Sequence, residues 1–148
     1  MFRKEDRRLD INIKSNIEKL SDIKEAFKIL SDPLDMIAYL IDLGKSSHNM
    51  SGQEKNDNNI IKGCTSKAWI MVSKVDNQEY YIKTDSDSHI VSGLLHLLSL
   101  SVNNQSKDFI NRVKGTDILN SIGLDGKITS QRTNGFLSAI QTLKERIN

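Results

Sequence analysis

The segment from His89 to Val102 is apolar on most of its circumference when drawn as a helix. Large aliphatic residues recur around it: Ile90, Val91, Leu94, Leu95, Leu97, Leu98 and Leu100. A helix of this kind has no face suited to water, so the other elements of the fold must surround it. The chain has 148 residues, 37% of them hydrophobic, which is enough for one domain with a substantial core.

Helical spacing of apolar residues also recurs on both sides of this central segment. It predicts a helix from Asn16 to Leu30 and another that begins at Asp32-Pro33, with aspartate as the N-cap. After the central segment it predicts short helices from about residue 106 and over residues 116–122. A last helix should run from Thr129 or Ser130 to about Ile147. We therefore expect a flexible N-terminal arm over 1–14 and a single domain over 15–148.

Between these helices the hydrophobic period changes to that of strands. Apolar and polar residues alternate over 68–73 and over 80–84, and residues 75–78 form a plausible hairpin turn. Residues 59–62 add a possible third strand, and the polar connector before it, residues 45–59, is expected to cross the surface without packing. The predicted fold is α+β, a three-stranded antiparallel sheet covered on one face by helices, in the order helix-helix-sheet-helices.

Charge, cysteine content and hydropathy exclude several classes of protein. The 21 Lys and Arg balance 19 Asp and Glu to a net charge of +2, which does not favour nucleic-acid binding. No apolar run approaches the roughly 20 residues of a membrane span, so we expect no association with a membrane. The charged start lacks a targeting pattern, so we expect a cytoplasmic protein. Phosphate-binding glycine motifs and the Gly-x-Ser-x-Gly motif are missing.

Cys64, the single cysteine, is the first candidate for chemistry. One cysteine cannot form an internal disulfide or a multi-cysteine metal site. It follows Gly63 on a predicted bend between polar and basic residues, including Lys62, Thr65 and Ser66, which suits an accessible thiol. The alternative is a buried structural cysteine, which is the commoner role of a free thiol.

Histidines and aspartates offer possible partners for this thiol. Paired with His89 or His96, Cys64 would form the nucleophile of a thiol hydrolase, and with His89 and Asp85 or Asp87 it could bind a metal. Neither arrangement has a recognised spacing. The structural alternative places His96 at the edge of the core and uses both aspartates as helix caps.

Three segments, in order, resemble the SufE family of sulfur-acceptor proteins. Ile61-Lys62-Gly63-Cys64-Thr65-Ser66-Lys67-Ala68-Trp69 is similar to the family's Gly-Cys-x-Ser-x-x-Trp segment. Residues 85–94 are similar to its Asp-Ser-Asp segment leading into an Ile-Val-x-Gly-Leu helix, and residues 130–136 to its Ser-x-x-Arg-x-Asn-Gly stretch. The resemblance covers about residues 15–147. It departs from the family pattern at Ala68 and in the unusually polar connector.

The resemblance implies a protein that accepts sulfur from a cysteine desulfurase, stimulates it and delivers the sulfur for iron–sulfur cluster assembly. By residue match, Cys64 is the persulfide acceptor, and Asp87 and Arg132 lie near its loop. Lys62, Gly63, Thr65 and Ser66 would meet the partner, a SufS-like desulfurase. A SufB-like scaffold would receive the sulfur.

On this interpretation the chain holds no cofactor of its own and no metal, since pyridoxal phosphate belongs to the desulfurase. We expect a monomer or a weak homodimer. The thiol hydrolase using Cys64 with His89 or His96 is the alternative function.

Overall fold

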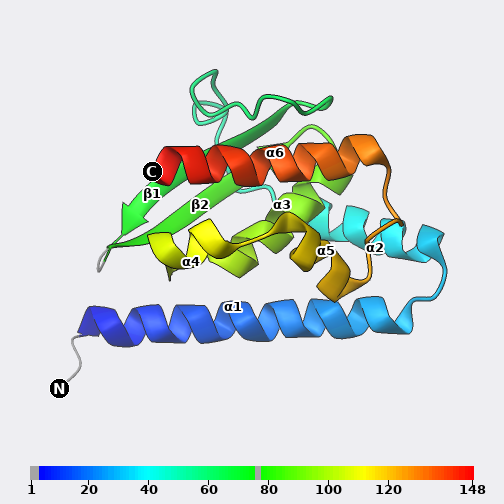
Figure 1. The fold of residues 1–148 in the computed structure, drawn as a ribbon, viewed down its shortest axis with the longest axis horizontal. Coiled ribbons are helices and arrows are strands. Elements are labelled where there is room, and N and C mark those ends of the chain that lie inside the picture. The colour runs from blue at the N-terminus through cyan, green and yellow to red at the C-terminus, as the bar shows by residue number, and fades with distance from the viewer. Residues whose placement is uncertain (1–3, 76–77) are drawn as a thin grey trace.

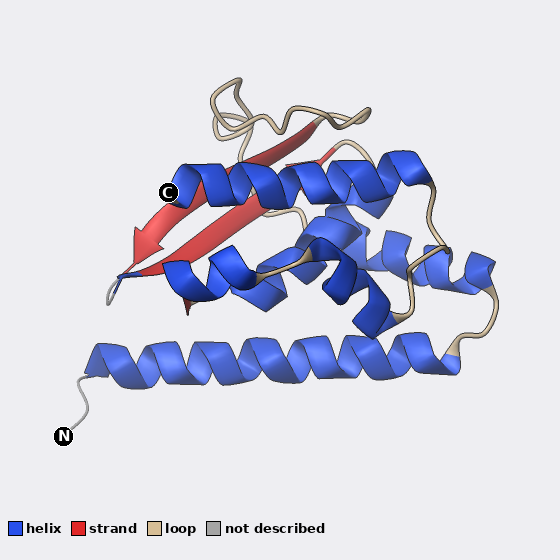
Figure 2. Ribbon diagram, viewed as in Figure 1, coloured by secondary structure: helices blue, strands red, loops and turns tan. Residues whose placement is uncertain are grey.

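The computed structural model describes residues 4–75 and 78–148, with side chains from Ser15 onward. Helices make up most of the molecule, and a small sheet lies at one side (Figures 1 and 2). The elements in chain order are α1 (Lys4–Ile29), α2 (Pro33–Lys45), β1 (Ala68–Val75), β2 (Glu79–Ser86), α3 (His89–Val102), β3 (Gln105–Ser106), α4 (Lys107–Arg112), α5 (Gly115–Ile122) and α6 (Ser130–Ile147). The predicted α+β class and element order are confirmed.

Helix α3 is the centre of the fold, as its apolar sequence requires. Eleven of its 14 residues are buried, and it contacts α1, α2, α6 and β2. In Figure 1 it lies between α1 and α6. The hydroxyl of Ser88 accepts a hydrogen bond from the Val91 N–H at 3.3 Å and thereby fixes where the helix begins.

Two glycines allow α2 and α3 to cross with their backbones in contact. A Cβ atom on Gly44 would lie 1.7 Å from the carbonyl oxygen of His89, and one on Gly93 would lie 2.4 Å from that of Leu40. No side chain fits at either position, because the atoms it would meet belong to backbone that cannot move aside. The crossing therefore fixes the N-terminal end of α3 against α2.

The sheet has the order β1-β2-β3 and is antiparallel throughout. The hairpin of β1 and β2 matches the predicted strands, and two residues of its turn, 76 and 77, lie outside the described residues. The expected third strand over 59–62 is wrong: only Ile60 forms an isolated bridge, to Trp69. The third strand is instead Gln105–Ser106, which pairs with the start of β2.

Two other regions differ from the sequence prediction. Helix α1 begins at Lys4 rather than near Asn16, which suits the Lys, Glu and Arg content of that stretch. The connector packs on the sheet, contrary to expectation. Its Lys55 ammonium lies 3.1 Å from an Asp85 oxygen, and its Glu54 carboxylate lies 3.2 Å from the Lys83 ammonium. These ion pairs hold the connector in place although most of its residues are polar.

Candidate functional site

Cys64 lies on a short loop whose two ends are joined by hydrogen bonds. The Ile61 N–H donates to the carbonyl oxygen of Ala68 at 2.8 Å, which closes the base of the loop. The Lys67 carbonyl accepts two more bonds, from the Ser86 hydroxyl at 2.7 Å and the Asp87 N–H at 3.0 Å. Residues 62–67 therefore form a closed loop at the start of β1, hereafter the cysteine loop.

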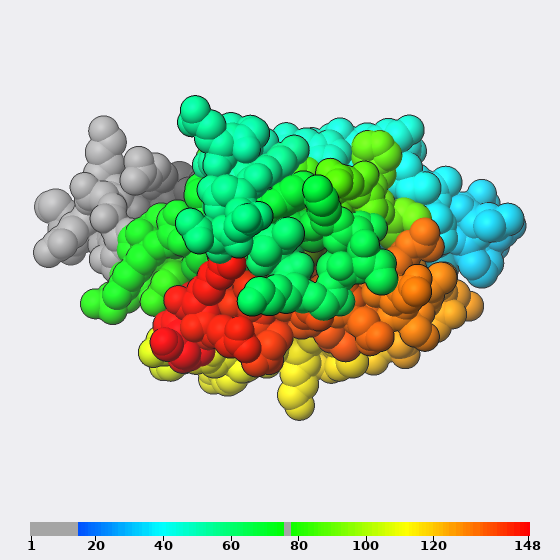
Figure 3. All heavy atoms as spheres, turned by 90° about the horizontal axis from the view of Figure 1, so that it is seen from above, coloured from blue at the N-terminus to red at the C-terminus, as the bar shows by residue number. Residues whose placement is uncertain are grey.

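The cysteine loop rests on helix α6, and glycines allow this close approach. A Cβ atom on Gly135 of α6 would lie 2.9 Å from the Cys64 sulfur. Gly63 has φ of +84°, and a Cβ atom there would meet the Ser138 hydroxyl at 2.9 Å. Figure 3 shows this part of the chain, in green, side by side with α6 in orange and red.

A small pocket of about 170 Å³ opens beside the thiol, which is itself half-buried. Its lining residues come from the cysteine loop and from the first turns of α3 and α6: Cys64, Thr65, Ser66, Ser88, Val91, Thr129, Gln131 and Arg132. Ser88 and Thr129 are the N-caps of those two helices. Helix N-termini carry partial positive charge, so both ends favour a negative charge in the pocket.

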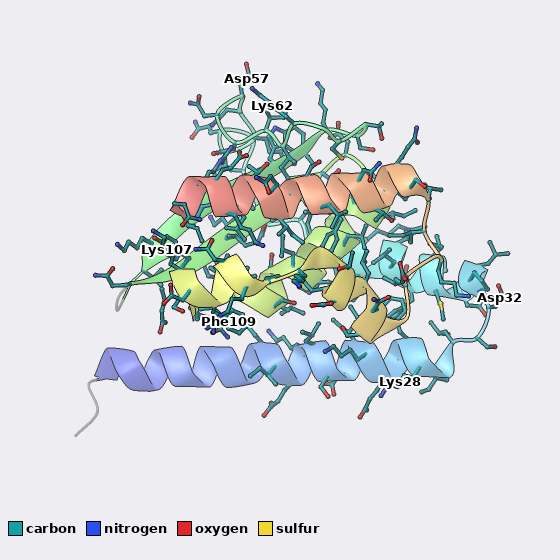
Figure 4. The ribbon with its side chains drawn as sticks, in the orientation of Figure 1. Lys28, Asp32, Asp57, Lys62, Lys107 and Phe109 are labelled. Atoms are coloured by element: carbon teal, nitrogen blue, oxygen red, sulfur yellow. The ribbon has the colours of Figure 1, made fainter. Side chains whose placement is uncertain are left out.

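Of the described residues that line this pocket, Arg132 is the one with a full charge, and it is half-buried. Its side chain forms no hydrogen bond to the rest of the described chain, so its guanidinium donors are available to a bound anion. Lys62, Gly63 and Thr65 are exposed to solvent. Figure 4 shows Lys62 above α6 at the outer surface.

The two candidate aspartates play different parts from those expected of helix caps. Asp87 is exposed and contacts the cysteine loop through its backbone N–H rather than its carboxylate. Asp85 is buried at the end of β2, where burial acts to raise the pKa of its carboxyl. Hydrogen bonds from His48, Lys55 and the Ser86 N–H outweigh that effect and hold the pKa below its usual value.

The histidines do not pair with the thiol. Within the described residues no hydrogen bond joins Cys64 to a histidine, and the ring of His89 faces that of His48 at 5.5 Å between centroids. His96 lines a different pocket, where burial and the charge of Lys19 lower its pKa. No group of three or more His, Cys, Asp or Glu that could bind a metal occurs in the part of the chain with described side chains.

The sequence did not single out two residues that shape this site: Ser86, which anchors the loop, and Gly135, on which the sulfur rests. Thr129 was expected as a possible start of the last helix, and it is the N-cap of α6 and also lines the pocket. Gly135 had a visible signal, because a glycine inside a predicted helix costs stability unless close packing requires it.

Comparisons with known proteins show what the chain is similar to. The model of a protein family described as "SufE: Fe-S metabolism associated domain" matches residues 21–147. An uncharacterized SufE-like protein of Rhizobium meliloti is 31% identical over 128 residues, which are 84% of this chain and 91% of the relative. SufE-like protein 1 of Arabidopsis thaliana, described as chloroplastic/mitochondrial, is 25% identical over 86% of this chain and 34% of its own length.

A solved structure shares the fold. The solution structure of a hypothetical protein from Thermus thermophilus superimposes with a TM-score of 0.65 at 17% identity, covering 87% of this chain and 93% of that one. Among the described residues, no helix has the length and apolar character needed to cross a bilayer.

Proposed function

Because the chain belongs to the SufE family of Fe–S metabolism, we propose that Cys64 accepts sulfur from the persulfide of a cysteine desulfurase and carries it toward cluster assembly. The observation that carries this proposal is the position of the lone thiol. It lies in a pocket formed by two helix N-termini and Arg132, on a loop that is open to a partner on its outer side.

The transfer is an exchange between sulfur atoms. The Cys64 thiolate attacks the outer sulfur of the desulfurase persulfide, a new S–S bond forms at Cys64, and the donor's S–S bond breaks. The donor cysteine leaves as a thiolate, so the numbers of S–S bonds and charges are unchanged and no external oxidant or reductant takes part. The chemistry that frees sulfur from cysteine stays with the desulfurase and its pyridoxal phosphate.

The pocket suits the product of this exchange. A persulfide is an anion when deprotonated, and the first turns of α3 and α6 together with Arg132 offer it positive charge. Its volume of about 170 Å³ leaves space beside the thiol for one additional sulfur atom. Thr65 and Ser66 add hydroxyl donors to the lining.

The proposal extends to the partners. The exposed residues Lys62, Gly63 and Thr65, with the half-buried Ser66, would meet a SufS-like desulfurase, whose turnover rises when its product sulfur is removed. A SufB-like scaffold would receive the sulfur. Asp87 would help hold the loop in its resting position through its backbone contact with Lys67. A cytoplasmic location and a monomer or weak homodimer belong to the same proposal.

Mass spectrometry of the intact protein tests the acceptor role. After incubation with a cysteine desulfurase and free cysteine, we expect a gain of one sulfur atom that disappears on reduction. Cys64→Ser should show no gain and should keep the fold, since the substitution changes one half-buried atom. A gain that persists in Cys64→Ser would contradict the assignment, as would no gain in a parent protein whose thiol is readily alkylated.

A further inference from the structure

A second pocket lies toward the C-terminal end of the central helix α3. It has a volume of about 370 Å³, within the range of small-molecule sites, and is more than twice as large as the pocket beside Cys64. Five segments meet there: the middle of α1, the chain after α2, strand β2, the second half of α3 and the turn that follows it. We call it the His96 pocket.

Buried polar side chains without protein partners line the His96 pocket. Thr84 and Asn104 are 5% and 6% exposed, and neither side chain forms a hydrogen bond within the described residues. Polar groups in folded proteins are nearly always bonded to protein, water or ligand. The polar atoms of these two side chains are open to the pocket rather than sealed in the core, so a polar ligand there can bond to them.

A hydrogen bond to the Asn103 side chain shows which end of its amide is free to bind a ligand. Its oxygen accepts the Ile82 N–H at 2.8 Å, which fixes the amide and leaves the NH₂ group as the free end. Asn103 is 9% exposed and lines the pocket. The NH₂ group is thus a preset donor, and its orientation is determined by the same bond that attaches α3 to β2.

Charge selects the class of ligand. Among the described residues, Lys19 at the mouth of the pocket is the one lining residue with a permanent charge, and no acidic side chain lines it. His96 adds a ring nitrogen that forms no hydrogen bond to the rest of the described protein. A bound molecule would meet one ammonium group outside and several hydrogen-bonding side chains inside.

From this arrangement we infer that the His96 pocket binds a small polar organic anion, with its carboxylate or phosphate beside Lys19 and its other polar groups against Thr84, Asn103 and Asn104. The volume exceeds what a lone inorganic oxyanion would fill. The site is separate from Cys64 and has no residue in common with the pocket there.

Four probes test the inference by titration of backbone amide signals in NMR. Glycerol 3-phosphate and glycerate place a phosphate or a carboxylate on the same short polyol skeleton, glycerol lacks the charge, and inorganic phosphate lacks the skeleton. We expect at least one organic anion to shift signals of residues 81–84 and 96–104 with a Kd of about 1 mM or tighter. Whichever of the two binds more tightly identifies the anionic group.

Variants distinguish specific binding in the pocket from nonspecific attraction of anions to surface lysines. Lys19→Gln and Thr84→Val should each weaken binding about fivefold, because each removes one polar contact. Lys28→Gln is the matched control, since Lys28 lies on the same helix outside the pocket and is labelled at the far end of α1 in Figure 4. It should bind as the parent does.

Three results would overturn the inference. The first is an absence of shifts at these residues with either organic anion up to about 10 mM, well beyond the expected Kd. The second is an equal loss of affinity in Lys28→Gln. The third is equal affinity for inorganic phosphate, which would reduce the pocket to an anion site without organic selectivity. Sulfur transfer to Cys64 should be unaffected in every variant.

Discussion

The two ends of helix α3 carry pockets that are built in opposite ways. At its N-terminal end, the Cys64 pocket depends on the backbone: two helix termini, a loop closed by main-chain bonds, and glycines where chains touch. At its C-terminal end, the His96 pocket depends on polar side chains from five separate segments. The Cys64 pocket should therefore tolerate the loss of a side chain better than the gain of one. The His96 pocket should tolerate the gain of a side chain better than the loss of one.

This difference also shows what each pocket can do. A pocket lined by two helix N-termini and one arginine favours negative charge beside the thiol. A pocket made of amide, hydroxyl and imidazole groups can distinguish molecules by the pattern of their hydrogen bonds. The first arrangement is suited to carrying a sulfur atom and the second to recognising a ligand.

Among variants that keep the thiol, Gly135→Ala should give the largest effect on sulfur transfer. The added methyl would lie 2.9 Å from the Cys64 sulfur, so the thiol must move out of its place. Because a shift of about 1 Å in a reacting group can cost up to about 100-fold, we expect transfer at least about tenfold slower. The measurement is the rate of persulfide formation on Cys64 by mass spectrometry.

Stability should change little in this variant, since alanine favours a helix over glycine by about 1 kcal/mol and offsets the crowding. Gly52→Ala is the control, because nothing lies within 4 Å of a Cβ atom at that position. Parent-like transfer by Gly135→Ala would show that the sulfur does not need its position on α6 and would contradict the backbone-built description.

Arg132→Ala should slow transfer by a smaller factor, about fivefold, as expected for the loss of one charged contact to an anion. The helix termini that line the same pocket would still favour the transferred sulfur. The test is the same rate measurement, together with thermal unfolding, which should be unchanged. Arg112→Ala, on α4 and outside this pocket, is the matched control. A rate equal to that of the parent would remove Arg132 from the mechanism.

Asp85→Asn should have the smallest effect on either pocket and act instead on stability. Asp85 lies between Thr84 of one pocket and Ser86, which anchors the cysteine loop, yet its carboxylate is bonded to the connector. We expect a loss of about 2 kcal/mol in the free energy of unfolding at neutral pH, with transfer within about twofold of the parent.

The pH dependence of this loss follows from the lowered pKa of Asp85 in the folded protein. Its contribution is present above the unfolded-state pKa of about 3.9 and disappears as pH falls through the lower folded value. The stability gap between parent and Asp85→Asn should therefore narrow in acid, as measured by urea unfolding at several pH values. Asp57→Asn, on the exposed part of the connector in Figure 4, is the control. A gap that is constant down to about pH 2 would contradict the assignment.

Periodicity in the sequence was enough to predict most of the helices and the hairpin, because their apolar residues recur at regular intervals. It could not predict β3, since two residues carry no period. Its position depends on Asn104, which has φ of +64° and donates its N–H to the Tyr80 carbonyl at 2.8 Å. That contact joins residues far apart in the chain, beyond the reach of local patterns.

The two pockets also differ in how far the sequence predicts them. The residues around Cys64 come in short motifs, so a resemblance pointed to both Cys64 and Arg132, which line one pocket in the structure. The buried polar residues of the His96 pocket are scattered along the chain, and singly each has the appearance of an ordinary surface residue. Only their shared burial, with no partner among the described residues, distinguishes Thr84 and Asn104.

The bond between Ile61 and Ala68 sets a limit on how far the cysteine can travel. Cys64 is three residues from Ile61, so a fully extended tether would carry its Cα atom no more than about 11 Å from that anchor. A loop that carries a bound group between two distant sites needs a longer flexible segment. If Cys64 carries sulfur as proposed, donor and recipient must both bring their reactive atoms to the same patch of this protein, one after the other.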